Sequence, residues 1–243
     1  MIIPENFSEK VLEAVEYFWN TRSSQGNKQA ESSITDKGNR SKVTGGKQLD
    51  GFVDLLKDIL VLNGVGEDKI FTNSDLELPG YFRPNKKWDL LVVDNKRLIV
   101  AIELKSQVGP SFGNNFNNRT EEAMGSALDI WTAYREGAFG SQPQPWLGYL
   151  MVLEDCDKSS VPVKNRTPHF PVFSEFEEAS YKKRYELFCK KLMLERQYAA
   201  TCFMTTKNED NGYSFEFPNM ELSMNKFIAS MLGAIFAYRN GDL

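Results

Sequence analysis

The stretch that decides the fold is Trp88–Gly109, WDLLVVDNKRLIVAIELKSQVG. Two apolar runs flank the polar DNKR segment, and this pattern predicts a β-hairpin. Yet Asp89 opens the first arm, and Glu103 and Lys105 lie within the second arm. Because burying an unpaired charge is costly, these three side chains either face solvent or hold a charged partner.

The composition is typical of a globular protein rather than a secreted or membrane-spanning one. The 243 residues are 41% hydrophobic and 26% charged, enough for a substantial core. The start of the chain lacks a basic region followed by an apolar one, and no apolar run approaches the roughly 18 residues of a membrane span. The three cysteines lack CxxC spacing, which predicts reduced thiols in the cytoplasm. They are Cys156, Cys189 and Cys202.

Charge is unevenly distributed along the chain. The net charge is −4, but residues 21–47 carry six basic and two acidic side chains and sum to +4, which leaves −8 for the remainder. This segment has almost no apolar residues, so we expect it to be flexible in the free protein and to order on DNA through phosphate contacts. A negative net charge therefore does not exclude a nucleic-acid partner, since only the contacted phosphates need neutralising.

Hydrophobic periodicity predicts an α/β fold, with one domain over residues 1–243 and a central mixed β-sheet flanked by helices. One helix is expected to begin at Asn118, where Glu121 three residues later completes a pattern like a capping box. The other helices are predicted at about 5–19, 48–62, 177–197 and 221–238. Besides the two hairpin arms, strands are predicted at 146–153 and 199–205.

The acids of the hairpin are placed to meet. A strand period of two puts Glu103 and Lys105 on one face, and antiparallel pairing brings Asp89 beside Glu103. Two converging carboxylates suit Mg²⁺, which activates a water and stabilises charge on an attacked phosphorus, while a lysine holds or deprotonates that water. The pattern thus predicts a metal-dependent nuclease. From the residues alone, an exposed strand face with ordinary cross-strand charge pairs remains open.

Longer stretches resemble one known family. They are IVAIELKSQVGPSFGNNFNNRTEEAMGSALDIW, PHFPVFSEFEEASYKKRYELFCKKLMLERQY and GGKQLDGF. Together these stretches resemble the XhoI family of type II restriction endonucleases, and the resemblance covers nearly the whole chain. It implies the PD-(D/E)xK nuclease fold and a homodimer that cleaves double-stranded DNA at the palindrome CTCGAG with Mg²⁺, leaving 5′ overhangs. It also implies a cognate DNA methyltransferase that protects the host's own sites.

The resemblance also implies roles for individual residues. By matching position, Asp89, Glu103 and the main-chain carbonyl of Leu104 are expected to bind the metal, and Lys105 is expected to be the catalytic lysine. One departure from the superfamily pattern is that Trp88, rather than proline, precedes the aspartate. The proline there is structural rather than chemical, so this change leaves the expected chemistry intact.

Base recognition needs side chains that reach base edges, and Ser111–Arg119 is the first candidate, as a loop after the catalytic strand. Asparagine pairs well with adenine and arginine with guanine. The candidates in this loop are Asn114, Asn115, Asn117 and Arg119. The alternative is that the asparagines form turns and that Asn118 only caps the following helix.

Two further regions are candidates for DNA contact. One is a polar loop with Lys164, Arg166 and His169, for which an ordinary solvated surface is the alternative. The other is the basic 21–47 segment, where Lys47 and Gln48 stand at a helix start beside two glycines and can approach a phosphate closely.

Three acids outside the hairpin, Glu77, Glu121 and Glu122, are candidates for an additional acid at the metal site. Two other functions stay open, a structure-selective repair or junction nuclease and a non-catalytic DNA-binding protein on the same fold. The complete set of two acids and a lysine favours an enzyme over the latter.

Overall fold

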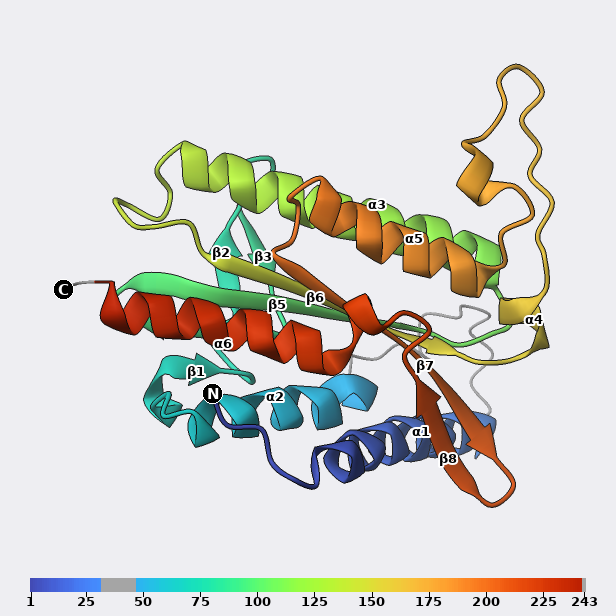
Figure 1. Cartoon of the computed structure of the whole chain (residues 1–243), viewed down its shortest axis with the longest axis horizontal. Coiled ribbons are helices and arrows are strands. Elements are labelled where there is room, and N and C mark those ends of the chain that lie inside the picture. Colours follow the sequence, from blue (N-terminus) through green and yellow to red (C-terminus); the bar gives the residue numbers. More distant parts are fainter. Residues whose placement is uncertain (32–46, 242–243) are drawn as a thin grey trace.

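The computed structural model describes residues 1–31 and 47–241, which form a mixed β-sheet with helices on both faces (Figure 1). Residues 32–46, the larger part of the predicted flexible basic segment, lie outside the described residues. The mixed α/β architecture predicted from periodicity is confirmed.

The main sheet has six strands in the order β1-β4-β5-β6-β7-β8. Strands β5, β6 and β7 run parallel, whereas β4 pairs with β5, and β8 with β7, in antiparallel fashion. A separate two-stranded sheet pairs β2 with β3. The strands are β1 (Ile70–Phe71), β2 (Glu77–Pro79), β3 (Asn85–Lys87), β4 (Leu90–Asp94), β5 (Arg97–Gln107), β6 (Trp146–Glu154), β7 (Ala200–Glu209) and β8 (Gly212–Glu216). The hairpin arms, β6 and β7 were predicted, but β1, β2, β3 and β8 were not.

The helices form two layers. Helices α1, α2 and α6 pack on one face of the sheet, and α3 and α5 lie side by side on the other (Figure 1). The helices are α1 (Phe7–Glu31), α2 (Asp50–Leu62), α3 (Phe112–Arg135), the short α4 (Asp157–Ser160), α5 (Tyr181–Leu194) and α6 (Met224–Asn240). Short 3-10 turns occur at Lys47–Leu49, Glu67–Lys69, Ser174–Phe176 and Met220–Leu222.

Strand β5 divides its side chains between the two layers. Ile102 and Leu104 pack in the core beneath α2 and α6, whereas Ala101 packs in the core beneath α3 and α5. Because side chains alternate along a strand, Glu103 and Lys105 follow Ala101 toward the α3 side. The core thus orients both predicted catalytic side chains to one face.

The first helix is longer than predicted. The apolar stripe ends near Trp19, yet α1 continues to Glu31, so the predicted helix end at about residue 19 is wrong. The hydroxyls of Ser23 and Ser24 donate to carbonyls one turn earlier, at 3.0 and 2.9 Å. The two hydroxyls thus have partners within the helix itself.

The predicted Ser111–Arg119 loop is also helical, because α3 begins at Phe112. Phe112 stacks on Tyr181, with ring centroids 5.7 Å apart, and Phe116 meets Tyr185 edge-on at 4.9 Å. This aromatic packing outweighs the weak helix propensity of glycine and asparagine. Asn118 therefore lies inside the helix, and the predicted cap at Asn118 is wrong.

Two predictions from composition can be compared with the structure. Cys156, Cys189 and Cys202 all lie in the described part of the chain and are free thiols. No helix among residues 1–31 and 47–241 has the length and apolar character needed to cross a bilayer.

The β2–β3 hairpin is tied to α3 by one buried carboxylate. Asp129 accepts hydrogen bonds from the main-chain nitrogens of Tyr81 and Phe82, both at 2.8 Å, and from Arg83 Nε at 2.7 Å. Burial acts to raise the pKa of Asp129, but the hydrogen bonds from Phe82 and Arg83 outweigh it, so the pKa is lowered. The charged form of Asp129 is therefore the one that the fold stabilises.

We expect Asp129→Asn to lower the free energy of unfolding by about 2 kcal/mol at neutral pH, since it weakens charge-assisted hydrogen bonds. A carboxyl group with a lowered folded-state pKa contributes stability above its unfolded pKa and loses it as the pH falls through the folded value. Urea unfolding from neutral pH to about pH 3 should therefore show the difference from wild type shrinking. Asp210→Asn, at an exposed turn, is the matched control, and a pH-independent difference contradicts this role of Asp129.

Candidate active site

The predicted acids and lysine meet where β4 begins. The Asp89 main-chain nitrogen donates to the Ile102 carbonyl at 3.1 Å, and Leu104 N donates to Asp89 Oδ2 at 2.7 Å. Leu90 is the first residue of β4 and pairs with Ile102, so this edge of β5 extends past the start of its neighbour. Since the N–H and C=O of one strand residue point the same way, the Leu104 carbonyl also faces this edge.

Glu103 is buried, with both carboxylate oxygens engaged. Oε1 lies 3.0 Å from Lys105 Nζ and 3.2 Å from Lys86 Nζ. Oε2 lies 3.2 Å from the Tyr198 hydroxyl, which shares its single proton with the Ala123 carbonyl at 3.0 Å. A carboxylate that is 1% exposed is thus held by two ammonium groups and a phenol.

Burial and neighbouring charges set the protonation of this cluster. Burial raises the pKa of Asp89, and the hydrogen bond from Leu104 opposes it only in part. Burial also acts to raise the pKa of Glu103, but Lys105 and Lys86 outweigh it and lower that pKa. The pKa of Lys105 is raised because Glu103 and Asp89 outweigh burial, whereas burial prevails at Lys86 and lowers its pKa. Glu103 and Lys105 therefore stabilise each other as a charged pair.

Helix α3 brings one of the three additional acids to the site. Glu122 Oε2 lies 3.9 Å from Lys105 Nζ and 2.6 Å from Arg119 Nη1. The Arg119 Nε is buried and has no hydrogen-bond partner within the described chain. The other two acids, Glu77 on β2 and Glu121 on α3, are also exposed. In the described part of the chain, neither forms an ion pair with Lys105 or Lys86.

Three residues near the site were missed from the sequence. Lys86 reaches Glu103 from β3, and Tyr198 reaches it from the bend just before β7. Asp50, at the start of α2, lies close enough to Asp89 for the Asp89 carboxylate to raise its pKa. Burial is the largest cause that raises the pKa of Asp50, followed by Asp54, with Asp89 adding to it. Lys86 stands three residues before Asp89, in NKKWD. This closeness in sequence was the one feature that could have marked Lys86 as a site residue.

The oxygen donors at this strand end are two carboxylates and one carbonyl. These are hard ligands of the kind that Mg²⁺ prefers, and they fit the predicted metal site in chemical type. Within residues 1–31 and 47–241, no group of three or more histidine, cysteine, aspartate or glutamate side chains is arranged to hold a metal ion. The predicted set of Asp89, Glu103 and the Leu104 carbonyl contains only two such side chains.

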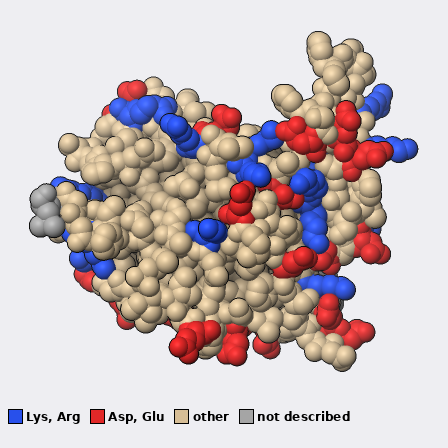
Figure 2. All heavy atoms as spheres, viewed as in Figure 1, with Lys and Arg blue, Asp and Glu red and all other residues tan. Residues whose placement is uncertain are grey.

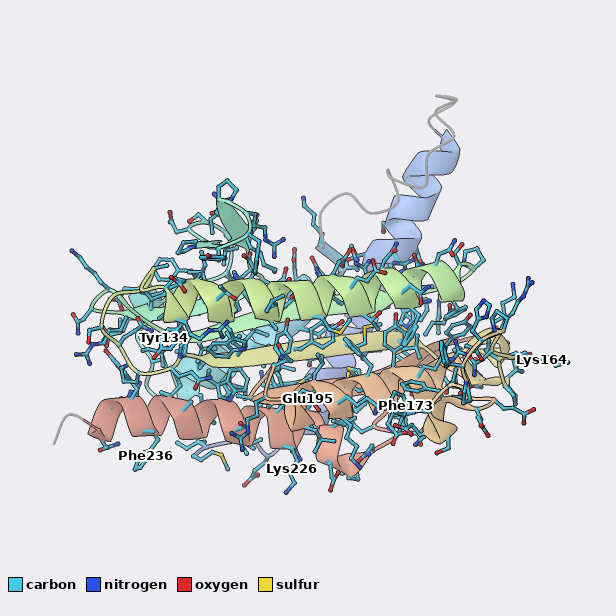
Figure 3. The ribbon with its side chains drawn as sticks, turned by 90° about the horizontal axis from the view of Figure 1, so that it is seen from above. Tyr134, Lys164, Phe173, Glu195, Lys226 and Phe236 are labelled. Atoms are coloured by element: carbon cyan, nitrogen blue, oxygen red, sulfur yellow. The ribbon has the colours of Figure 1, made fainter. Side chains whose placement is uncertain are left out.

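The predicted DNA-contacting residues fall into three places. On the first turns of α3, Asn114 and Asn117 are exposed, Asn115 is half-buried and Arg119 turns to Glu122. Lys164, Arg166 and His169 are exposed on residues 161–180, which project beyond α5 (Figures 1 and 3). Before α2, Lys47 is exposed but Gln48 is buried, so the predicted phosphate contact of the Gln48 side chain is not supported by its position.

Charges are mixed on the surface near the projecting segment. Figure 2 shows acidic and basic side chains interspersed at this end of the molecule, with no large patch of one sign on the face shown. DNA contact here would depend on individual side chains rather than on a uniform positive field.

Comparison with known proteins identifies the family. The sequence model of the family described as restriction endonuclease XhoI matches residues 28–216 of this chain. The chain is 52% identical over 212 residues to type II restriction enzyme BstVI of Geobacillus stearothermophilus, covering 85% of this chain and 94% of the relative. It is 50% identical over 183 residues to type II restriction enzyme XhoI of Xanthomonas vasicola, covering 74% and 73%. No solved structure gives a significant match. The chain belongs to the XhoI family of restriction endonucleases.

Proposed function

We propose that the protein is a type II restriction endonuclease that hydrolyses double-stranded DNA at the palindrome CTCGAG, depends on Mg²⁺ and leaves 5′ overhangs. The observation that carries the chemistry is the meeting of Asp89, Glu103, Leu104 and Lys105 at one strand end. The target sequence rests on the family resemblance. The antiparallel β4–β5 pair followed by parallel β6 supports a PD-(D/E)xK core.

We infer that Asp89, Glu103 and the Leu104 carbonyl hold the metal ion. When bound, Mg²⁺ supplies an activated water and stabilises the charge that develops on the attacked phosphate. The chain's own contribution is to orient these donors, since the Leu104 amide fixes Asp89 and Tyr198 fixes Glu103. A donor set that is oriented before the substrate arrives needs little reorganisation during the reaction.

Lys105 acts in this proposal as a charged hydrogen-bond donor. Its pKa is raised because Glu103 and Asp89 outweigh the effect of burial, so the ammonium form persists at neutral pH. A charged lysine holds the attacking water and stabilises negative charge on the phosphate better than it accepts a proton. Glu122, 3.9 Å away, helps to orient it.

DNA recognition is assigned to the end of the molecule where α3 begins and residues 161–180 project. Asn114, Asn117 and Arg119 are proposed to contact bases or phosphates from α3, with Asn115 supporting them. Lys164, Arg166, His169 and Lys47 add contacts from the exposed segments. A palindromic target calls for a two-fold homodimer, and a cognate DNA methyltransferase would protect the host's own sites.

Digestion of a plasmid with one CTCGAG site tests the proposal. We expect clean cuts at that hexamer with Mg²⁺, none with EDTA, and 5′ overhangs when the ends are sequenced. A plasmid with one base pair of the site changed is the matched control and should stay intact, because a mismatch costs about 1–3 kcal/mol in protein–DNA recognition.

The other outcomes separate the alternatives. Cuts at one different sequence keep the endonuclease and reject the inherited target. Cuts only at branched or damaged DNA favour a repair or junction nuclease. Tight DNA binding with no cleavage favours a non-catalytic DNA-binding protein.

A further inference from the structure

A second lysine reaches the same carboxylate oxygen as Lys105. Lys86 belongs to β3, in the small hairpin outside the main sheet, and its side chain is 12% exposed. Its ammonium lies 4.2 Å from the ring centroid of Trp88 and 3.2 Å from Glu103 Oε1. The reaction proposed above gives Lys86 no part, although its side chain is less exposed than that of Lys105.

The contacts of Glu103 leave little room for another cation. Lys86 and Lys105 both contact Oε1, while the Tyr198 hydroxyl occupies Oε2. Each carboxylate oxygen accepts through about two lone pairs, so two ammonium groups already fill Oε1. Asp89, Glu103 and the two lysines also form a set of two acids and two bases, which balances its charge without a metal ion.

We propose that Lys86 is a positioning residue that holds Glu103 in the metal-free protein and releases it when Mg²⁺ binds. This role rests on the metal site proposed above. Tyr198 and the Ala123 carbonyl hold Oε2 within the core, so Oε1 is the oxygen left for a divalent cation. Two ammonium groups and a divalent cation on one oxygen repel one another strongly at these distances. One ammonium group therefore leaves.

The strands and contacts that hold the two lysines indicate that Lys86 is the one whose ammonium group leaves Glu103. Lys105 lies in the long strand β5, paired along its length with β6, and has Glu122 as a second partner. Lys86 lies in a three-residue strand whose neighbours Asn85 and Lys87 are exposed. Its flexible four-carbon stem can turn to solvent without a change in the main chain.

The test is calorimetric titration of the full chain with Mg²⁺ in the absence of DNA. We expect Lys86→Met to bind Mg²⁺ about tenfold more tightly than wild type, because it removes a unit charge that competes for Glu103 Oε1 from 3.2 Å away. Methionine keeps the packing on Trp88. Lys86→Arg keeps the competing charge and should stay within about twofold of wild type, although its fork differs in shape. Lys87→Met, at the exposed neighbouring position, is the matched control and should match wild type.

A second measurement guards against a merely structural effect. The rise in unfolding temperature on adding Mg²⁺ should be larger for Lys86→Met than for wild type, because tighter binding to the folded state stabilises it more. A lysine that served only packing would weaken the metal site when removed, the opposite direction. Equal or weaker Mg²⁺ binding by Lys86→Met, or tighter binding by Lys87→Met as well, overturns the inference.

The Mg²⁺-binding result for Lys86 can be distinguished from the test of the proposed function. Mg²⁺-dependent plasmid cleavage together with unchanged Mg²⁺ affinity in Lys86→Met rejects only the role of Lys86. No Mg²⁺ binding by either protein, together with no cleavage of the plasmid, rejects both proposals.

Discussion

Glu103→Gln is expected to slow DNA cleavage by about a thousandfold or more, because a metal ligand supports several kcal/mol of transition-state stabilisation. Glutamine keeps the shape of the side chain but removes the charge that pairs with Lys105 at 3.0 Å. DNA binding should be kept or improved, since one negative charge beside a phosphate is removed. Single-turnover cleavage rates at saturating Mg²⁺ and mobility-shift binding without metal measure the two effects.

Asp89→Asn and Glu121→Gln make the Glu103→Gln result interpretable, whereas Glu103→Ala does not. Glu103→Ala removes the partner of two lysines at once, and breaking a buried ion pair costs about 3–5 kcal/mol, so its loss of activity would be mixed with loss of fold. Asp89→Asn tests the same proposed metal site through an acid that is held by the Leu104 amide instead. Glu121→Gln, on the exposed side of α3, is the matched control. Folded Glu103→Gln that cleaves within about tenfold of wild type contradicts the assigned role of Glu103.

Lys105→Met is expected to lower the cleavage rate by about 10²–10⁴-fold at saturating Mg²⁺, the usual effect of removing a group that assists proton transfer or stabilises charge. Because Glu103 and Asp89 raise the pKa of Lys105, the lysine should lose its charge only above the ordinary lysine range. The pH–rate profile of wild type should therefore show no decline caused by Lys105 between neutral pH and that range. Single-turnover rates across this pH interval measure both expectations.

One matched variant and one alternative pH profile show how the Lys105→Met result is to be interpreted. Lys96→Met, at the exposed tip of the β4–β5 hairpin, removes a lysine without touching the site and should cleave like wild type. A wild-type rate that rises with pH between neutral pH and the ordinary lysine range, with that rise absent in Lys105→Met, would show that Lys105 acts in its neutral form as a base. That finding would reject the charged-donor role and keep Lys105 as a catalytic residue.

Local pattern predicted the strand that carries the proposed catalytic residues but not its surroundings. The alternation around Asp89 and the apolar run before Glu103 were enough for the β4–β5 hairpin, because both arms and their turn are contiguous in sequence. Lys86 and Tyr198 meet Glu103 only through tertiary packing. Tyr198 is 95 residues away from Glu103, at the start of an apolar stretch, and nothing in the local sequence marks it as a hydrogen-bond partner of a buried acid.

The errors in the helices have a common physical origin. The asparagine-rich start of α3 and the polar end of α1 both have weak local signals, and packing or hydrogen bonding decides them. At α3, Phe112 and Phe116 contact tyrosines of α5, which the sequence places some 65 or more residues later. The consequence for the site is direct, because Arg119, which was predicted at the end of a loop, stands inside the same helix as Glu122.

The point at which β4 begins has a consequence for how this enzyme family can vary. The amide and carbonyl of Leu104 are free for Asp89 and for a ligand only because Leu90, opposite Ile102, is the first residue of β4. If β4 were two residues longer at its start, its main chain would pair with Leu104 and block the proposed metal site, although none of the proposed catalytic side chains had changed. Insertions just before Asp89 should thus be far more harmful than insertions of equal length at the hairpin tip.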